Sequence, residues 1–168
     1  MSHPSDQIYL RDIEQSDLPI FFEHQLDQKA VHMAAFTAPD PSDRAAFDHY
    51  WQKVVAIEQN FFQTIVFEGQ VVGHVLKHEA FGVPEVGYWI GRPFWGKGIT
   101  TVALTLFLAL VTVRPIFGRI AADNIASQRV LQKCGFTISH TERGYANARG
   151  MEIDEVVLKL VRQQDSIL

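Results

Sequence analysis

The stretch Phe94-Trp95-Gly96-Lys97-Gly98-Ile99-Thr100 joins a β-rich segment, residues 85–90, to a long apolar segment, residues 99–113. The first segment predicts a strand and the second predicts a helix. The first N–H groups of a helix have no partners within it and lie at the positive end of its dipole. Gly96 and Gly98 lack the Cβ atoms that would keep an anion away from these donors. The stretch therefore fits a pyrophosphate cradle, and it also fits an ordinary strand-to-helix turn.

The same loop partly matches the P-loop of nucleotide-binding proteins. Gly91, Gly96 and Lys97 satisfy the G-x-x-x-x-G-K part of that motif, but position 98 is Gly where a Ser or Thr would hold Mg²⁺. The sequence also offers no clear hydrophobic strand ending in an Asp that would serve as a second metal ligand. These departures disfavour a nucleotide-binding protein, which would be stabilised by Mg-ATP.

A second block, residues 123–136, reads Asp-Asn-Ile-Ala-Ser-Gln-Arg-Val-Leu-Gln-Lys-Cys-Gly-Phe. It lies between two segments, residues 116–122 and 136–145, that predict strands. Asn124 is expected to cap a helix, and Gly135 to end it in the left-handed conformation. Taken alone, the block predicts an N-capped amphipathic helix and nothing more.

The remaining elements can be read from periodicity and turn residues. They comprise a strand at residues 8–11, a helix from about 16 to 30, a loop at 36–42, a second helix, a hairpin of residues 61–67 and 70–79 around Glu68-Gly69, and a last strand at 151–161. Ser42 is expected to cap the second helix, in which Ala46, Tyr50, Val54 and Ile57 recur near helical spacing. A βαβ-type centre flanked by hairpins predicts an α/β (α+β) fold with a mixed sheet.

Length and composition predict one globular domain over residues 1–168, with a core of residues 7–162. The 168 residues are 47% hydrophobic and include twelve Phe, which excludes a disordered chain. A barrel of about 250 residues does not fit in this length. The formal charge of −4 provides no basic face for nucleic acid, and it suits a cationic small substrate or peptide.

Cysteine usage and hydropathy predict a cytoplasmic protein. Cys134 is the only cysteine, so an internal disulfide and a Cys-rich zinc site are excluded. Residues 1–20 contain no apolar core of a secretion signal. The longest apolar stretch, interrupted by threonines, is shorter than the roughly 20 residues that span a bilayer. No membrane partner is therefore expected.

The blocks at 94–100 and 123–136 resemble motifs A and B of the GNAT acyltransferases, which use acetyl-CoA. Motif A reads [RQ]-x-x-G-x-[GA], and here Trp95 stands in its first place and Thr100 in its last. The branch that includes the ribosomal-protein N-terminal acetyltransferases is similar in its E-[IV]-G-Y-W strand, its N-x-x-S-x-x-V-L-x-K-x-G-F helix and its ending at residues 154–158. The resemblance covers about residues 85–160, nearly half of the chain.

This resemblance implies a single-domain GNAT-like sheet with helices on both faces. Residues 85–90 would be its fourth strand and 116–122 its fifth, and the pantetheine arm would lie where these two splay apart. The pyrophosphate would bind the backbone of the motif A loop, where the Cβ of Thr100 is a departure from the family. The implied cofactor-binding residues are Trp89, Ile90, Trp95, Gly96, Lys97, Gly98, Ile99, Thr100, Asn124 and Ser127.

Acetyl transfer to an amine requires loss of an ammonium proton, polarisation of the thioester carbonyl and stabilisation of the leaving thiolate. Glu85 matches the acidic residue that often serves the family as general base, here through a water, or it is a solvated acid at a strand start. The N–H groups near Trp89 and Ile90 would bind the thioester oxygen. Many family members place a proton-donating Tyr where this chain has Leu131. Ser127 is therefore the candidate that protonates the leaving thiolate.

Other polar residues are expected to be ordinary. His74 and His78 lie on one face of a strand but about 13 Å apart, too far to share a metal ion. We therefore expect no metal site, and we expect the seven histidines at surface or loop positions. Glu142 and Arg143 predict a solvated strand edge.

The sequence thus predicts an N-acetyltransferase that uses acetyl-CoA and a primary amine: a protein N-terminus, a polyamine, an aminoglycoside or another small amine. The alternative is an acyl-CoA-binding or regulatory module that kept the fold with little turnover, which Leu131 and Thr100 favour. The acceptor pocket would be built by the first half of the chain, which carries no motif. The chain is expected to be a monomer or a homodimer.

Overall fold

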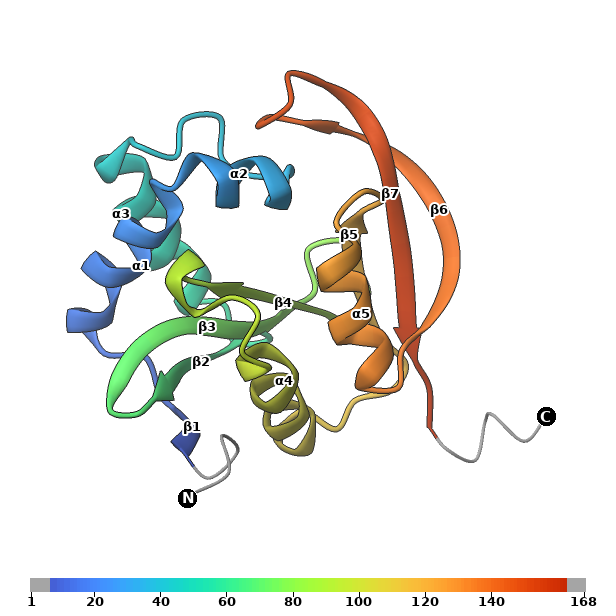
Figure 1. Ribbon diagram of the computed structural model, residues 1–168, viewed down its shortest axis with the longest axis horizontal. Coiled ribbons are helices and arrows are strands. Elements are labelled where there is room, and N and C mark those ends of the chain that lie inside the picture. The colour runs from blue at the N-terminus through green and yellow to red at the C-terminus, as the bar shows by residue number, and fades with distance from the viewer. Residues whose placement is uncertain (1–6, 163–168) are drawn as a thin grey trace.

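The computed structural model describes residues 7–162. Seven strands form one sheet in the order β1-β2-β3-β4-β5-β7-β6 (Figure 1). All neighbouring strands are antiparallel except β4 and β5, which are parallel. The strands are β1 (Ile8–Arg11), β2 (Phe61–Phe67), β3 (Gln70–His78), β4 (Glu85–Ile90), β5 (Ile116–Ala121), β6 (Thr137–Ala146) and β7 (Met151–Leu160). The predicted mixed α+β sheet is confirmed.

Helices cover both faces of this sheet. They are η2 (Gln15–Asp17), α1 (Leu18–Gln25), α2 (Gln28–Ala34), α3 (Arg44–Val55), η3 (Arg92–Phe94), α4 (Ile99–Leu110) and α5 (Ile125–Lys133). The main core joins α4 and α5 to β3, β4 and β5, with Phe107 and Leu131 fully buried. A smaller aromatic core, centred on Phe21 and Trp51, lies under α1 and α3. None of the helices in residues 7–162 is long and apolar enough to cross a membrane.

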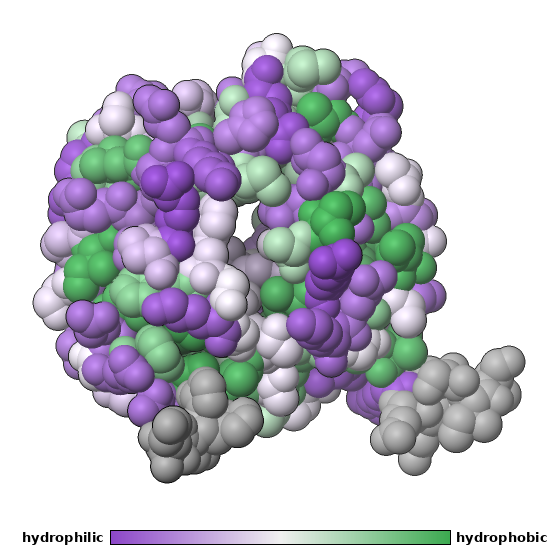
Figure 2. All heavy atoms as spheres, viewed as in Figure 1, coloured by the Kyte–Doolittle hydropathy of each residue, from purple (hydrophilic) through white to green (hydrophobic). Residues whose placement is uncertain are grey.

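The sheet opens between its two parallel strands. β4 and β5 pair at Glu85–Phe117 and Val86–Gly118, at the start of each strand. Over the described lengths of the two strands, no other residues pair. Beyond that point the strands diverge, and the space-filling view shows an opening between the α1–α3 half and the half with α5, β6 and β7 (Figure 2). We call this divergence the splay.

Two details of the predicted helices were wrong, namely the extent of the first helix and the cap of the second. The chain does not run as one helix from residue 16 to 30, because α1 ends at Gln25 and the Asp27 side chain starts a new helix by accepting the Ala30 N–H at 2.9 Å. The second helix, α3, is capped by Asp43 and not by Ser42, because the Asp43 carboxylate accepts the Ala46 N–H at 3.0 Å.

The buried face of α3 also differs from the expected one. Phe47 and Trp51 are buried, whereas Tyr50 is 54% exposed. Phe47 and Trp51 pack into the aromatic core with Phe21 and Phe22, and this sets the rotation of the helix. The helix after the motif A loop ends at Leu110 and not at Val113, and Arg114 donates to the carbonyls of Leu108 and Val111 at that end.

Candidate active site

A cleft of about 420 Å³ lies where the splay meets the N-terminal ends of α4 and α5. Its walls come from β4, the loop before α4, and one face of α5, and α2 forms its roof. Nine of the ten predicted cofactor-binding residues line this cleft, namely Trp89, Ile90, Trp95, Gly96, Gly98, Ile99, Thr100, Asn124 and Ser127. Lys97 lies in the same loop but does not line the cleft.

The loop before α4 presents free backbone donors to the cleft. Gly96 and Gly98 have φ angles of 74° and 76°, and apart from each glycine and its two chain neighbours no atom of the described residues lies within 4 Å of where their Cβ atoms would be. Gly98 is the N-cap of α4, and within the described chain no side chain caps this helix. Trp95, the departure from motif A, donates its indole N–H to the Ile90 carbonyl at 2.8 Å and ties the loop to β4. The cradle therefore fits a pyrophosphate.

Gly98→Ala is expected to weaken acetyl-CoA binding at least about 10-fold, because a Cβ at positive φ strains the loop and crowds the donors. Isothermal titration calorimetry with acetyl-CoA measures the effect. Gly150→Ala is the matched control, since Gly150 also has positive φ and open space but lies in the β6–β7 turn. Both variants should lose similar stability, and equal Kd values for the two would contradict the cradle.

Only one of the two predicted oxyanion donors on β4 faces the splay. The Trp89 carbonyl lies against Gly73 of β3, and the Gly91 N–H donates to the Val72 carbonyl at 2.9 Å. Backbone groups alternate in direction along a strand, so the N–H of Ile90 points to the splay and that of Trp89 points to β3. Of the two predicted oxyanion donors, the geometry favours Ile90.

Asn124 and Ser127 meet Tyr88 on the opposite wall. The Asn124 side chain accepts the Ser127 N–H at 3.3 Å, as the predicted N-cap, and its amide donates to the Met33 carbonyl of α2 at 3.2 Å. The Tyr88 hydroxyl donates to the Ser127 carbonyl at 3.1 Å, and burial raises the pKa of that phenol. Leu131 is fully buried beside Gly118, away from the cleft lining.

Glu85 lies at the narrow end of the splay and is 3% exposed. Arg119 on β5 donates its Nε to Glu85 at 2.6 Å and a terminal nitrogen to Glu142 on β6. His78 Nε2 lies 3.5 Å from the other oxygen of Glu85. Glu155 on β7 lies 3.7 Å from the guanidinium, so one arginine faces three carboxylates from three strands. Glu142 lies on the edge strand β6 with its side chain 41% exposed, as predicted, and it also accepts a hydrogen bond from Arg119.

Hydrogen bonds hold α2 in place as the roof of the cleft. The chain at and after its C-terminal end supplies carbonyls, and the β6–β7 turn supplies donors: Ala148 N–H to Ala35 at 3.1 Å, and the Asn147 amide to Thr37 at 2.7 Å. Arg149 donates to the His32 carbonyl at 2.8 Å and forms a bidentate pair with Asp123, just before α5.

Sequence reasoning missed several lining residues. They are Ala30, Met33, Ala34, Tyr88, Phe94, Thr101, Ala126, Arg129, Val130 and Lys133. Arg129, Val130 and Lys133 lie on one face of α5 at helical spacing, so the predicted helix could have indicated them. The α2 residues gave no such signal, because their helix is held over the cleft by long-range contacts with the β6–β7 turn and with Asn124.

Among the described histidines, His32, His49 and His140 are exposed as expected, whereas His24, His74 and His78 are partly buried; His3 lies outside the described residues. His74 packs against Phe21 and Trp51, and burial lowers its pKa to about 3, with further lowering by His24. The Nδ1 atoms of His24 and His74 and the Nε1 of Trp89 are buried and have no hydrogen-bond partner in residues 7–162. No group of His, Cys, Asp and Glu that could hold a metal ion is found in the same residues.

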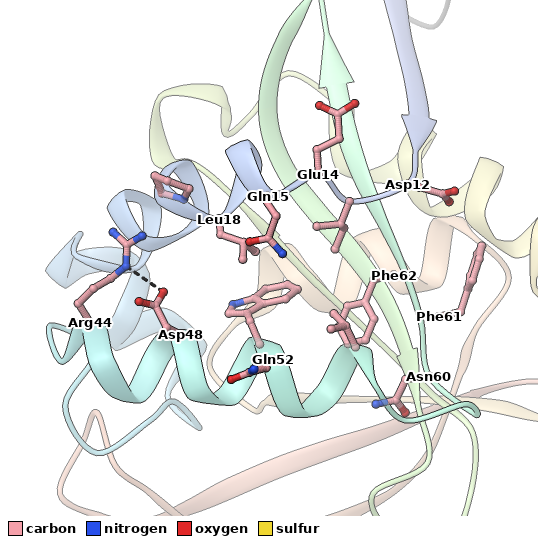
Figure 3. Close-up of a pocket in the computed structure, with 14 residues that line it drawn as sticks. Asp12, Glu14, Gln15, Leu18, Arg44, Asp48, Gln52, Asn60, Phe61 and Phe62 are labelled. Atoms are coloured by element: carbon pink, nitrogen blue, oxygen red, sulfur yellow. Dashed lines mark hydrogen bonds and ion pairs between the residues drawn. The ribbon is translucent and has the colours of Figure 1, made fainter.

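A second hollow, of about 680 Å³, lies between α3 and the end of β1 and shares no lining residue with the cleft (Figure 3). Asp12, Glu14 and Asp48 line it, with an Arg44–Asp48 ion pair at its edge (Figure 3). Because carboxylates repel an anionic cofactor, we assign the cofactor to the smaller cleft.

A family model described as the acetyltransferase (GNAT) domain matches residues 7–137. The chain belongs to the GNAT acetyltransferases. This GNAT chain is an acetyl-CoA-dependent acetyltransferase, as the two motif blocks predicted. It is 24% identical over 149 residues, 82% of the chain and 81% of the relative, to the "Putative ribosomal N-acetyltransferase YdaF" of Bacillus subtilis (strain 168).

Solved structures share the fold of this GNAT chain. RimL, a ribosomal L7/L12 alpha-N-protein acetyltransferase in complex with coenzyme A, superposes with a TM-score of 0.77 at 18% identity, over 95% of this chain and 96% of that one. Spermidine N-acetyltransferase from Vibrio cholerae, in complex with CoA and spermine, gives a TM-score of 0.79 at 14% identity, over 97% and 99%.

Proposed function

We propose that this GNAT chain transfers the acetyl group of acetyl-CoA directly to a primary amine, either the α-amino group of a protein N-terminus or a small-molecule amine. The observation that carries the proposal is the cleft itself, where the uncapped N-terminus of α4 meets a splay with a buried carboxylate, Glu85, at its narrow end. The lone Cys134 supports a reducing, cytoplasmic setting.

The residues divide the chemistry among them. When bound, acetyl-CoA supplies a thioester, so that a C–N bond to the amine forms as the C–S bond breaks. The Ile90 N–H donates to the carbonyl oxygen as negative charge develops there. Glu85 takes the amine proton through a water. Ser127 donates a hydrogen bond to the leaving thiolate and passes it a proton from solvent. No nucleophilic side chain is required.

The acceptor is proposed only as a class. The names of the Bacillus subtilis relative and of RimL support a protein N-terminus, and the Vibrio cholerae enzyme supports a polyamine. The alternative, a module that binds acyl-CoA with little turnover, is supported by Leu131, which stands where many family members have a proton-donating Tyr, and by Thr100 in the cradle.

Release of free thiol from acetyl-CoA, followed across a panel of amines, separates these two functions. We expect release with at least one primary amine and tight binding of acetyl-CoA by calorimetry. Binding without release for every amine in the panel would instead assign the chain to the binding module. Stabilisation by Mg-ATP that acetyl-CoA cannot match would overturn both.

A further inference from the structure

Tyr88 stands on β4 just beyond the point where the splay begins. Val86, Tyr88 and Ile90 share one face of β4, because side chains two residues apart on a strand point to the same side. Val86 and Ile90 are buried in the main core with α4 and α5, and Tyr88 packs against that core. The pairing of β4 with β5 reaches as far as Val86–Gly118. Tyr88 is therefore the first residue of this face that lies where the two strands have parted.

The Tyr88 phenol connects the two walls of the cofactor cleft. Its hydroxyl donates to the Ser127 carbonyl of α5 at 3.1 Å, and both residues line the cleft. A carbonyl inside an α-helix accepts the N–H four residues ahead, and the bond from Tyr88 occupies its second lone pair. The hydroxyl can therefore turn to another acceptor in the cleft while the helix keeps its own hydrogen bonds.

The position where many family members carry a proton-donating Tyr is turned away from the cleft. Leu131 is fully buried, and a Cβ added at Gly118 would lie 2.8 Å from its Cδ1 atom. Leu131 thus packs against β5 beside the paired ends of the two parallel strands. At this position α5 supplies an aliphatic side chain to the core, and a phenol reaches the cleft from β4, on the facing wall.

Glu85 and Tyr88 lie on opposite faces of β4. They are three residues apart on one strand, so their side chains point to opposite sides. The Ile90 N–H points into the splay between them, where the proposed function places the thioester oxygen. The sulfur is bonded to the same carbon as that oxygen. An amine that loses its proton on the Glu85 side therefore leaves the Tyr88 side for the departing sulfur.

The surroundings of Tyr88 keep its phenol protonated. Burial raises the pKa of Tyr88, the hydrogen bond with Ser127 opposes this rise, and the Cys134 thiol adds to it. Burial also raises the pKa of Cys134. The charged side chains on the same wall are Arg129 and Lys133, which line the cleft from α5. In this setting the phenol acts as a hydrogen-bond donor that keeps its proton.

We propose that Tyr88 is a further catalytic residue, whose hydroxyl turns from the Ser127 carbonyl to donate a hydrogen bond to the leaving sulfur. As the C–S bond breaks, its electron pair stays on the sulfur, and the Tyr88 hydrogen bond stabilises the charge that develops there. Ser127 passes the sulfur a proton from solvent, as in the proposed function. The inference rests on that function and adds a second donor, from β4, to the donor on α5.

Tyr88→Phe keeps the ring and removes the hydroxyl. It should lower kcat about 10- to 100-fold, because a hydrogen bond to a charged group is lost. The Kd for acetyl-CoA should change less than about 3-fold, because the charge develops only during transfer. Thiol release with the most reactive amine of the panel gives kcat, and calorimetry gives Kd. Tyr9→Phe is the matched control, since Tyr9 is 52% exposed on β1, three strands away from β4.

Binding of CoA and of desulfo-CoA, which lacks the sulfur, tests the contact without turnover. Calorimetry at about pH 7 and about pH 9.5 brackets the ordinary thiol pKa of about 8.5. The preference for CoA at the higher pH, relative to that at the lower pH, should be about 10-fold smaller in Tyr88→Phe than in the wild type. Titration of Cys134 affects both ligands alike, so the comparison isolates the sulfur.

The outcomes separate this inference from the proposed function. If no amine releases thiol, the proposed function fails, while a smaller CoA preference in Tyr88→Phe would still support the contact with sulfur. If transfer occurs and Tyr88→Phe matches Tyr9→Phe in kcat and in CoA preference, the inference is overturned. A loss of kcat with an unchanged CoA preference would also overturn the contact with sulfur.

A double variant separates a direct contact from an effect through Ser127. Tyr88→Phe should lower kcat and the CoA preference further when it is added to Ser127→Ala, because each hydroxyl reaches the sulfur by itself. If the double variant equals Ser127→Ala in both quantities, the phenol only holds Ser127 in place and is not catalytic. Thermal unfolding of each variant confirms that it folds.

Discussion

Asp17→Asn is expected to lower the free energy of unfolding by about 3 kcal/mol, because it breaks a buried ion pair and leaves one partner behind. Asp17 is 1% exposed and accepts both terminal nitrogens of Arg11, at 2.7 and 2.8 Å. It also accepts the Thr64 hydroxyl at 2.7 Å and the Glu14 N–H at 2.9 Å. An Asn would keep the shape but turn an NH₂ group toward these donors.

The contribution of Asp17 should also depend on pH. Burial alone would raise the pKa of this carboxyl, but the hydrogen bonds from Arg11, Glu14 and Thr64 hold it below its ordinary range. A carboxyl with a lowered folded pKa stabilises the protein above its unfolded pKa of about 4, and this stability is lost as the pH falls through the folded pKa. The difference between wild type and Asp17→Asn should therefore narrow below about pH 4.

Urea unfolding at several pH values measures both effects. Asp48→Asn is the control, since Asp48 forms an exposed pair with Arg44 one helical turn away, and its loss should change stability by no more than about 0.5 kcal/mol. If the difference in the free energy of unfolding between wild type and Asp17→Asn stays constant down to pH 3, the charge of Asp17 does not contribute to stability.

The motif blocks were predicted well because their residues act on the backbone beside them. Asn124 caps α5 through its own side chain, and Gly135 ends the helix at φ 95°. Gly98 stands at the start of α4 at positive φ, where any other residue would be strained. These are local rules, so a single sequence is enough to apply them.

The charged residues around Arg119 were not predictable in the same way. The charges around Arg119 come from β4, β5, β6 and β7, and residues far apart in the chain meet only because the strand order is β4-β5-β7-β6. Within its own segment, Glu142 stands beside Arg143, which does pair outward with Asp154, so an exposed edge was the natural reading. Alternation along the strand turns Glu142 to the opposite face from Arg143, but the arginine that it meets there, Arg119, comes from another strand that the sequence does not place beside it.

The early helices show the same limit. The pattern around residue 16 to 30 is continuous enough for one helix, and only the Asp27 cap reveals the break between α1 and α2. That break lets α2 extend over the cleft, where the β6–β7 turn holds it. The Asp27 cap and the long-range contact with the β6–β7 turn together determine where α2 lies. Neither can be inferred from the periodicity of the sequence.

Glu85→Gln is expected to lower kcat about 10²- to 10⁴-fold while the Kd for acetyl-CoA changes less than about 3-fold. Gln can still accept the hydrogen bond from Arg119, but it cannot take a proton from the amine through water. Glu85 does not line the cofactor cleft, so binding should persist. Thiol release and calorimetry give the two quantities, and Glu79→Gln, an exposed carboxylate before β4, is the control.

The pH profile separates a base from a merely structural carboxylate. Without a general base, only amine that is already neutral can attack, so the remaining activity of Glu85→Gln should rise with pH toward the ordinary amine pKa, about 8 for a peptide α-amino group. The wild-type rate should reach its plateau at a lower pH than the rate of Glu85→Gln. A structural role predicts lower stability with an unchanged pH profile, because a neutral hydrogen bond in place of the ion pair with Arg119 would destabilise the protein without changing how the proton leaves. Equal kcat for Glu85→Gln and Glu79→Gln across this range would assign the base elsewhere.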